Sequence, residues 1–432
     1  MKFSFPFRRR TLDFELNDEN VLYYAELGDL QPVSDEVDEL LGALHNPLGS
    51  SELRDLVDSS SKVVIVADDL TRGTPQSKIL PPLLNYLNEA GVPDSNIRVI
   101  IALGTHRPMD SREILARFGS EVVSRVQVVN HDFKDPAKIV YLGKTPSGTP
   151  IEINKEVYEA DLRILVGTVM PHPLAGWGGG AKMIQPGVCS EKTTESTHFI
   201  GGTYPDPLQL PGNPDSPVRL EIEEVAGKLG PTFIVNTVLN HGGGLVGCFA
   251  GQYVEAHRAA VKIAEQLFRP AIPELADVVI CNAFPCDIDF WQGFKPFYYA
   301  YLGVKQSGTI IFAISAPEGV SGDAPEHEDT VLEWSATDPQ LTLDALADGR
   351  IADRIAGSVC VAHARLLERA EVICVSDGLS PAEIRQLGFR PATSMEQAIE
   401  MTLAKHGERA TFGVIPYGGL TLVKKDNPVV EW

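Results

Sequence analysis

The chain has 432 residues, of which 44% are hydrophobic and 22% are charged, and its formal net charge is −21. This length exceeds one ordinary hydrophobic core, so two domains are expected, and the composition excludes a disordered chain. An acidic surface repels phosphate backbones, which argues against a nucleic-acid partner.

The N-terminus and the cysteines narrow the class of protein further. MKFSFPFRRRTLDFEL has basic residues without a following apolar segment, and no apolar run reaches the roughly 18 residues of a membrane span, so neither a signal peptide nor a membrane partner is predicted. The six cysteines are scattered without a CxxC pair: Cys189, Cys248, Cys281, Cys286, Cys360 and Cys374. They predict reduced thiols in a cytoplasmic protein.

Apolar, β-branched segments alternate with amphipathic ones in the first part of the chain. Strands are predicted over SKVVIVADD (61–69), IRVIIALGTH (97–106), VQVVN (126–130) and ADLRILVGTVMPH (160–172). Helices are predicted between them over SKILPPLLNYLNEAG (77–91) and SREILARFG (111–119). This alternation is typical of an α/β fold with a largely parallel sheet covered by helices.

A second α/β series follows a helical connector, YVEAHRAAVKIAEQLFRP (253–270). Its predicted strands are ELADVVICNAFP (274–285), SGTIIFAISAPEG (307–319) and AEVICVSDGL (370–379), and a helix over 394–407 and strand-like segments over 411–425 close the chain. The helices over 253–270 and 394–407 act as two connectors and predict an N-terminal catalytic and cofactor domain (1–268), rejoined by 405–432, and a C-terminal α/β domain (269–404). We expect the active site in the cleft between these domains.

Polar clusters follow three strands of the first series: DDLTR (68–72), GTHR (104–107) and PHP (171–173). In parallel sheets ligands bind outside the carboxyl ends of the strands, so these clusters are expected to meet at one edge. Exposed N–H groups at the start of the helix after DDLTRGTP would suit an anion. The alternative is that Thr71 and Thr74 merely cap this helix, beside a surface Asp–Arg pair.

Two histidines in these clusters are candidate bases. A lone histidine is more often structural. Because His106 lies at the same predicted sheet edge as Arg72, a functional role and a structural role are given equal weight. His172 stands between two prolines, whose fixed φ angles would hold its ring in place, and this favours a catalytic role.

The glycine-rich loop GWGGGAK (176–182) is expected to leave its backbone bare for a ligand. It is not a Walker loop, because Lys182 follows Ala181 and no Ser or Thr comes next, and it lacks the GxGxxG spacing. Lys182 could contact phosphate, form a Schiff base or attach a group covalently. His198 could be an ordinary surface residue; the histidines lack zinc spacing, but an imidazole also binds nickel if a cofactor supplies the other ligands.

DFWQGFKP (289–296) lies at the corresponding edge of the second series. Gln292 and Lys295 are three residues apart and would share one face of a helical turn. Facing Arg72 across the cleft, Lys295 would bind a carboxylate, whereas the alternative is an exposed aromatic turn.

Taken in order, these motifs resemble the lactate racemase family, whose members use a nickel-pincer nucleotide. DDLTRGTP is similar to the DDxTRxxP segment of the family, GTHRP to its first histidine motif and PHP to its second. GGGAKMIQPG and His198 resemble the segment with the cofactor lysine and the nickel histidine. The resemblance extends from residue 68 to residue 295.

The resemblance implies a racemase or epimerase of 2-hydroxy acids that works by reversible hydride transfer. Lys182 would carry the cofactor, a pyridinium-3-thioamide-5-thiocarboxylic acid mononucleotide, through a thioamide link, and His198 would complete the nickel coordination. His106 and His172 would exchange the hydroxyl proton of the two enantiomers, so each should titrate near neutral pH. The other implied contacts are to the nucleotide (Asp69, Leu70, Thr71, Arg72, Pro186) and to the substrate (Arg72, Trp291, Gln292, Lys295).

Trp291 departs from the family pattern, in which a tyrosine precedes the glutamine. A bulkier ring without the phenol, together with Phe294, Phe297, Tyr298 and Tyr299, would favour a more apolar substrate than lactate. The implied partners are this small 2-hydroxy acid and the enzymes that build the cofactor. The alternatives are an NAD-type 2-hydroxyacid oxidoreductase, which the glycine run disfavours, and a non-catalytic ligand-binding protein on the same fold, which the two candidate bases disfavour.

Overall fold

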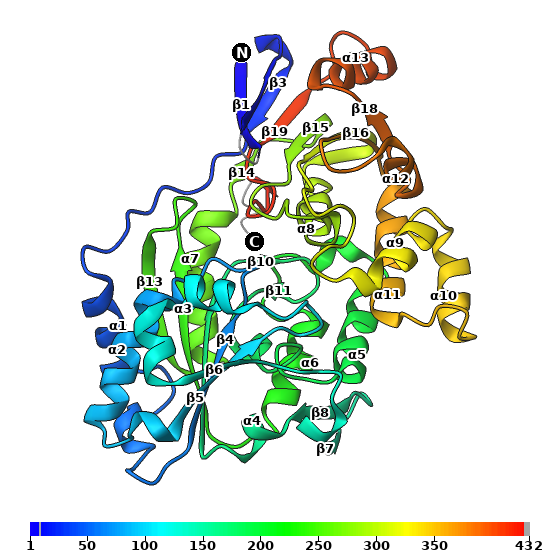
Figure 1. Ribbon diagram of the computed structural model, residues 1–432. Coiled ribbons are helices and arrows are strands. Elements are labelled where there is room, and N and C mark those ends of the chain that lie inside the picture. The colour runs from blue at the N-terminus through cyan, green and yellow to red at the C-terminus, as the bar shows by residue number, and fades with distance from the viewer. Residues whose placement is uncertain (8–9, 427–432) are drawn as a thin grey trace, which may run out of the picture.

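The computed structural model describes residues 1–7 and 10–426 and contains two sheets of six strands each (Figure 1). The first sheet has the order β13-β12-β9-β4-β5-β6, and its strands are parallel except for β13. The bounds of its strands are β4 (Val63–Asp68), β5 (Ile97–Ala102), β6 (Gln127–Asn130), β9 (Leu162–Thr168), β12 (Thr232–Leu239) and β13 (Leu245–Gln252).

The second sheet is parallel throughout, in the order β18-β17-β16-β15-β19-β3. Its strands are β3 (Val21–Tyr24), β15 (Ala276–Asn282), β16 (Val304–Ile314), β17 (Glu371–Ser376), β18 (Arg390–Ala392) and β19 (Phe412–Ile415). The predicted α/β class with two largely parallel sheets is therefore confirmed.

Helices cover both faces of the first sheet because its strands are apolar on both sides. On one face α1 (Glu36–His45), α2 (Gln76–Glu89) and α3 (Ser111–Arg125) form a core with alternate residues of β4, β5 and β9. The opposite face packs on α4 (Lys155–Glu159), α6 (Pro217–Ala226) and α7 (Glu255–Phe268).

One hydrophobic core runs on from this second face to the second sheet. It includes α8 (Phe290–Ala300), α11 (Arg354–Leu367) and α12 (Pro381–Gln386). Three further helices pack against α11: α5 (Glu191–Gly202), α9 (Glu328–Trp334) and α10 (Pro339–Ala347). The outer face of the second sheet is covered by α13 (Met395–His406) and by a hairpin of β1 (Lys2–Phe7) and β2 (Arg10–Glu15). Three further short strand pairs are β7 (Ile139–Lys144) with β8 (Pro150–Asn154), β10 (Pro171–His172) with β11 (Gly176–Trp177), and β14 (Ala271–Ile272) with β20 (Lys424–Lys425).

The predicted return of residues 405–432 to the first domain is wrong for β19, which lies in the second sheet between β15 and β3. Strand β3 is an edge strand of this sheet and the hairpin of β1 and β2 packs on the outer face of the sheet; Figure 1 shows β1 and β3 beside β19. The physical reason is that FGVI is buried along its whole length, so its composition suits an inner strand of either sheet.

The structure also bears on the predictions about cysteines and membranes. All six cysteines are free and buried. Within residues 1–7 and 10–426, no helix combines the length and the apolar character that crossing a membrane requires.

Candidate active site

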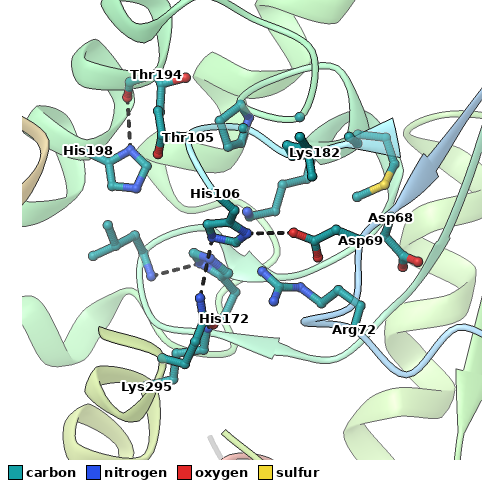
Figure 2. A pocket seen from close by; sticks show the side chains of 18 of the residues that line it. Asp68, Asp69, Arg72, Thr105, His106, His172, Lys182, Thr194, His198 and Lys295 are labelled. Atoms are coloured by element: carbon teal, nitrogen blue, oxygen red, sulfur yellow. Dashed lines mark hydrogen bonds and ion pairs between the residues drawn. The ribbon is translucent and has the colours of Figure 1, made fainter. Parts of the chain in front are cut away.

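A cavity lies at the carboxyl ends of β4, β5 and β9 and is closed by α8 of the second sheet and by α5 (Figure 2). The sequence motifs expected at this edge of the sheet therefore meet in one place. Ten of the predicted site residues line the cavity: Asp69, Arg72, His106, His172, Lys182, Pro186, His198, Trp291, Gln292 and Lys295.

Leu70 and Thr71 are not among the lining residues of this cavity. The Leu70 side chain packs on the core of the first sheet, so only its backbone could face a cofactor. The Thr71 hydroxyl donates a hydrogen bond to Asp69 Oδ1 at 2.5 Å.

Capping of α2 by Thr71 or Thr74 is wrong, because both hydroxyls bind carboxylates instead. Thr74 donates to Asp68, which also accepts hydrogen bonds from Gln76 Nε2 at 2.8 Å and Arg117 Nη2 at 2.6 Å. The loop after β4 is thus built around two buried carboxylates, of which Asp69 is the one beside the candidate base.

His106 is held by carboxylates. Its Nδ1 lies 2.7 Å from Asp69 Oδ2 and 3.7 Å from Asp323 Oδ2. Burial favours the neutral ring, but the charges of Asp323 and Asp69 outweigh it and raise the pKa of His106 above its ordinary value. Burial likewise opposes ionisation of Asp69, yet His106 and Arg72 hold the pKa of this carboxyl well below its usual range.

His172 has the opposite environment. Burial, followed by the nearby positive charges of Lys182, Arg72 and Lys295, lowers its pKa well below the ordinary value. The Leu174 and Ala175 N–H groups donate to its Nδ1 at 3.3 and 3.1 Å, so Nε2 carries the hydrogen of the neutral ring. The two histidines therefore do not titrate alike, contrary to the expectation that both would do so near neutral pH.

The expectation of a backbone left bare for a ligand holds only for Gly179, which lines the cavity, because the other glycines of the run allow close backbone packing instead. Gly179 and Gly180 both have positive φ, and a Cβ on Gly180 would lie 2.9 Å from the ring of His257. A Cβ on Gly176 would overlap the Asn213 carbonyl group. The loop turns sharply against the core and so brings Lys182 into the cavity (Figure 2).

Lys182 and His198 have the forms that covalent attachment and metal binding require. Burial, and then the charges of Arg72 and Arg219, lower the pKa of the Lys182 amine well below its ordinary value, which favours the nucleophilic neutral form. His198 Nδ1 donates to the Thr194 carbonyl at 2.9 Å, which leaves Nε2 free, and burial lowers its pKa to about 4. Among residues 1–7 and 10–426 no cluster of three His, Cys, Asp or Glu side chains could hold a metal, so further ligands would have to come from a cofactor.

Gln292 and Lys295 share one face of α8, as predicted, and both are buried, so the exposed-turn alternative is wrong. Asp289 begins this helix by accepting the Gln292 N–H at 2.7 Å, and Lys295 Nζ donates to Gln292 Oε1. Burial, with repulsion from Arg72, lowers the pKa of Lys295 to about 8. The helix therefore presents an ammonium group and an amide to the cavity opposite Arg72 (Figure 2).

Of the aromatic residues expected to enlarge the apolar surface, Trp291 and Phe294 line the cavity. The other three point into the protein interior: Phe297 stacks on His363 at 4.7 Å, Tyr298 Oη donates to the Pro207 carbonyl at 2.9 Å, and Tyr299 is buried in the core.

Reasoning from the sequence did not identify Asp323 or the pair His327–Asp353. Asp323 lies in the loop after β16 and reaches both His106 and Gln292. His327 Nδ1 lies 2.7 Å from Asp353 Oδ2, and its ring packs at 4.5 Å against Trp291. Asp323 lies in an irregular loop, His327 ends a short 3-10 helix and Asp353 caps α11. Their contacts depend on the folded chain, so the sequence offered no signal for them beyond the residue types themselves.

Comparisons with known proteins agree with this geometry. Residues 7–205 match the lactate racemase N-terminal domain, and residues 273–423 match the lactate racemase C-terminal domain. The lactate racemase of Lactiplantibacillus plantarum is 30% identical over 97% of this chain and 99% of its own length. The chain belongs to the lactate racemase family.

Two further matches come from Thermoanaerobacterium thermosaccharolyticum. Its lactate racemase is 28% identical over 97% of this chain and 98% of its own length. A solved structure, the lactate racemase apoprotein from that organism, has a TM-score of 0.86 and 27% identity, and the match covers 98% of this chain and 100% of that one. These relatives support a racemase function.

Proposed function

We propose that the protein is a racemase or epimerase of 2-hydroxy acids that acts by reversible hydride transfer with a nickel-pincer nucleotide attached at Lys182. The observation that carries this proposal is the pairing of two histidines of opposite charge preference in one cavity, His106 and His172. Racemisation needs one group that removes a proton and another that supplies one, and this arrangement offers both.

The residues present fit the cofactor. Lys182 offers for the thioamide link an amine whose pKa burial lowers well below its ordinary value, and His198 offers a free Nε2 for nickel. Asp69, Arg72 and Pro186 line the same cavity as candidate contacts to the nucleotide. Leu70 and Thr71, which lie between Asp69 and Arg72 in the chain, would contribute only their backbone. When bound, the nucleotide with its nickel supplies a reversible hydride acceptor for the α-carbon of the substrate.

The substrate carboxylate would bind between Arg72 and Lys295, with Gln292 orienting the ammonium group. Both cations are confined by the cavity walls, so a planar carboxylate meets donors from both sheets at once. Trp291 and Phe294 form the apolar side of the cavity, and a 2-hydroxy acid with an apolar side chain larger than that of lactate would suit it.

The histidines would move the hydroxyl proton. His172, neutral, takes this proton from one enantiomer once its ring turns away from the two backbone N–H groups, whose 3.1 and 3.3 Å hydrogen bonds are long. His106, charged, returns a proton to the carbonyl oxygen after the 2-keto acid has rotated. The other enantiomer uses the same pair in the reverse direction.

The test is production of the protein together with the enzymes that build the cofactor, which are its proposed partners in the cytoplasm. The proposal predicts nickel, a mass adduct on the peptide that contains Lys182, and interconversion of D- and L-2-hydroxy acids in chiral chromatography. His198→Ala should lose the metal, whereas His106→Ala and His172→Ala should keep it and lose racemisation. An unmodified Lys182 without nickel, or full activity of His172→Ala, would contradict the proposed roles.

A further inference from the structure

Asp323 joins the two sheets at the cavity. It is only 1% exposed, and its Oδ2 accepts a hydrogen bond from Gln292 Nε2 at 2.8 Å. The same oxygen lies 3.7 Å from His106 Nδ1. One carboxylate therefore contacts the candidate proton donor of the first sheet and the carboxylate-binding helix of the second.

The main chain of Asp323 is fixed in the same way. Its N–H donates to Asp289 Oδ2 at 2.8 Å, and its carbonyl accepts the N–H of Arg107 at 3.0 Å. Asp289 also begins α8, and Arg107 directly follows His106. The main chain at Asp323 is therefore hydrogen-bonded both to the start of α8 and to the residue after His106, so the Asp323 side chain has little freedom to lie elsewhere.

A buried carboxylate is costly unless opposite charges face it. Burial raises the pKa of the neighbouring Asp289 to about 6, so that group favours its neutral form more than an ordinary aspartate does. The charged groups that act on His106 are Asp323, Asp69 and Arg72, and His198 lies across the cavity. Burial and Arg72 lower the pKa of His106, but the two carboxylates outweigh both, so this pKa lies above its ordinary value.

We propose that Asp323 is a positioning residue whose carboxylate joins the ring of His106 to the amide of Gln292. It holds the proton donor and the helix that binds the substrate carboxylate in one geometry across the two sheets. The contact exists without the cofactor, and its consequence for turnover rests on the proposed racemase function.

The experiment is a histidine titration by ¹⁵N NMR in the cofactor-free protein, with the His106 signal assigned by its loss in His106→Gln. Asp323→Asn keeps an oxygen acceptor for Gln292 and removes only the charge, so His106 should titrate at lower pH than in the wild type. Asp323→Ser removes the same charge with a smaller side chain and should shift the titration in the same direction. Asp323→Glu should retain more of the wild-type behaviour, and Asp132→Asn, a matched change in an exposed carboxylate paired with Lys138, should leave it unchanged.

In the cofactor-loaded enzyme, Asp323→Asn should lower kcat by about 10²-fold and change KM less, because a displaced proton donor costs rate more than binding. An unchanged His106 titration in both charge-removing variants would overturn the proposal. Failure of the loaded wild type to racemise any 2-hydroxy acid would instead overturn the proposed function, while the titration would still decide whether Asp323 acts on His106.

Discussion

Lys295 provides the clearest test of how the cavity binds its substrate. Lys295→Met keeps an unbranched side chain and removes the ammonium group that faces Arg72 across the cavity. A hydrogen bond to a charged group contributes about 1.5–3 kcal/mol, so the affinity for a 2-hydroxy or 2-keto acid should fall roughly 10- to 150-fold. Folding should tolerate the change, because the ammonium group is buried and repelled by Arg72.

The assay is isothermal titration calorimetry with an unreactive 2-keto acid, and Lys262→Met on the exposed side of α7 serves as the control. Burial lowers the pKa of Lys295 to about 8, so its charge is present below pH 8 and is lost as the pH rises through that value. Wild-type affinity should therefore weaken above pH 8, whereas the affinity of Lys295→Met should not depend on pH there. Equal affinity of the variant and the wild type at pH 7 would refute this account of carboxylate binding.

Three other outcomes follow from the structure. Trp291→Ala should raise kcat/KM for bulky 2-hydroxy acids relative to lactate by on the order of tenfold in a chiral panel assay, and an unchanged ratio would mean that Trp291 is not a wall of the substrate site. Gly180→Ala should destabilise the fold by about 1–3 kcal/mol in urea unfolding, because Gly180 has a positive φ and its Cβ would lie 2.9 Å from His257. Gly42→Ala in the exposed part of α1 should instead stabilise the fold by roughly 0.5–1 kcal/mol, and equal effects of the two changes would refute the role of Gly180 in close packing. Burial lowers the pKa values of His131, His198 and His363 to about 4, so the unfolded chain binds more protons than the folded one between pH 6.5 and 4. The free energy of unfolding should therefore fall over this range, by about 3 kcal/mol for each histidine. The variant His363→Phe should remove the contribution of one of them.

The sequence predicted the edge of the site because strand periodicity marks where a parallel strand ends. Asp69, His106 and His172 each follow an apolar β-branched segment, and in a parallel sheet such positions share one edge. Gln292 and Lys295 could be placed on one helix face from their spacing alone. These parts of the site depend on local patterns that one sequence contains.

The remainder depends on contacts between distant segments. Asp323 lies 217 residues after His106, in a loop without periodicity, and nothing in its neighbourhood indicates that it reaches the first sheet. The two histidines look equivalent in sequence, but the carboxylates around one and the cations around the other separate their pKa values. Strand β19 could not be assigned to a sheet, because a fully buried strand has the same composition in either.

The central claim is that the hydrogen on the α-carbon moves as a hydride and returns to the same carbon. The direct test is to convert an enantiopure 2-hydroxy acid deuterated at C2 in ordinary water with the cofactor-loaded enzyme. Enantiomers are separated by chiral chromatography, and deuterium is measured by mass spectrometry. The account predicts that the opposite enantiomer forms and keeps its deuterium at C2. Racemisation with loss of deuterium to water would contradict it, because the α-hydrogen would then have left as a proton.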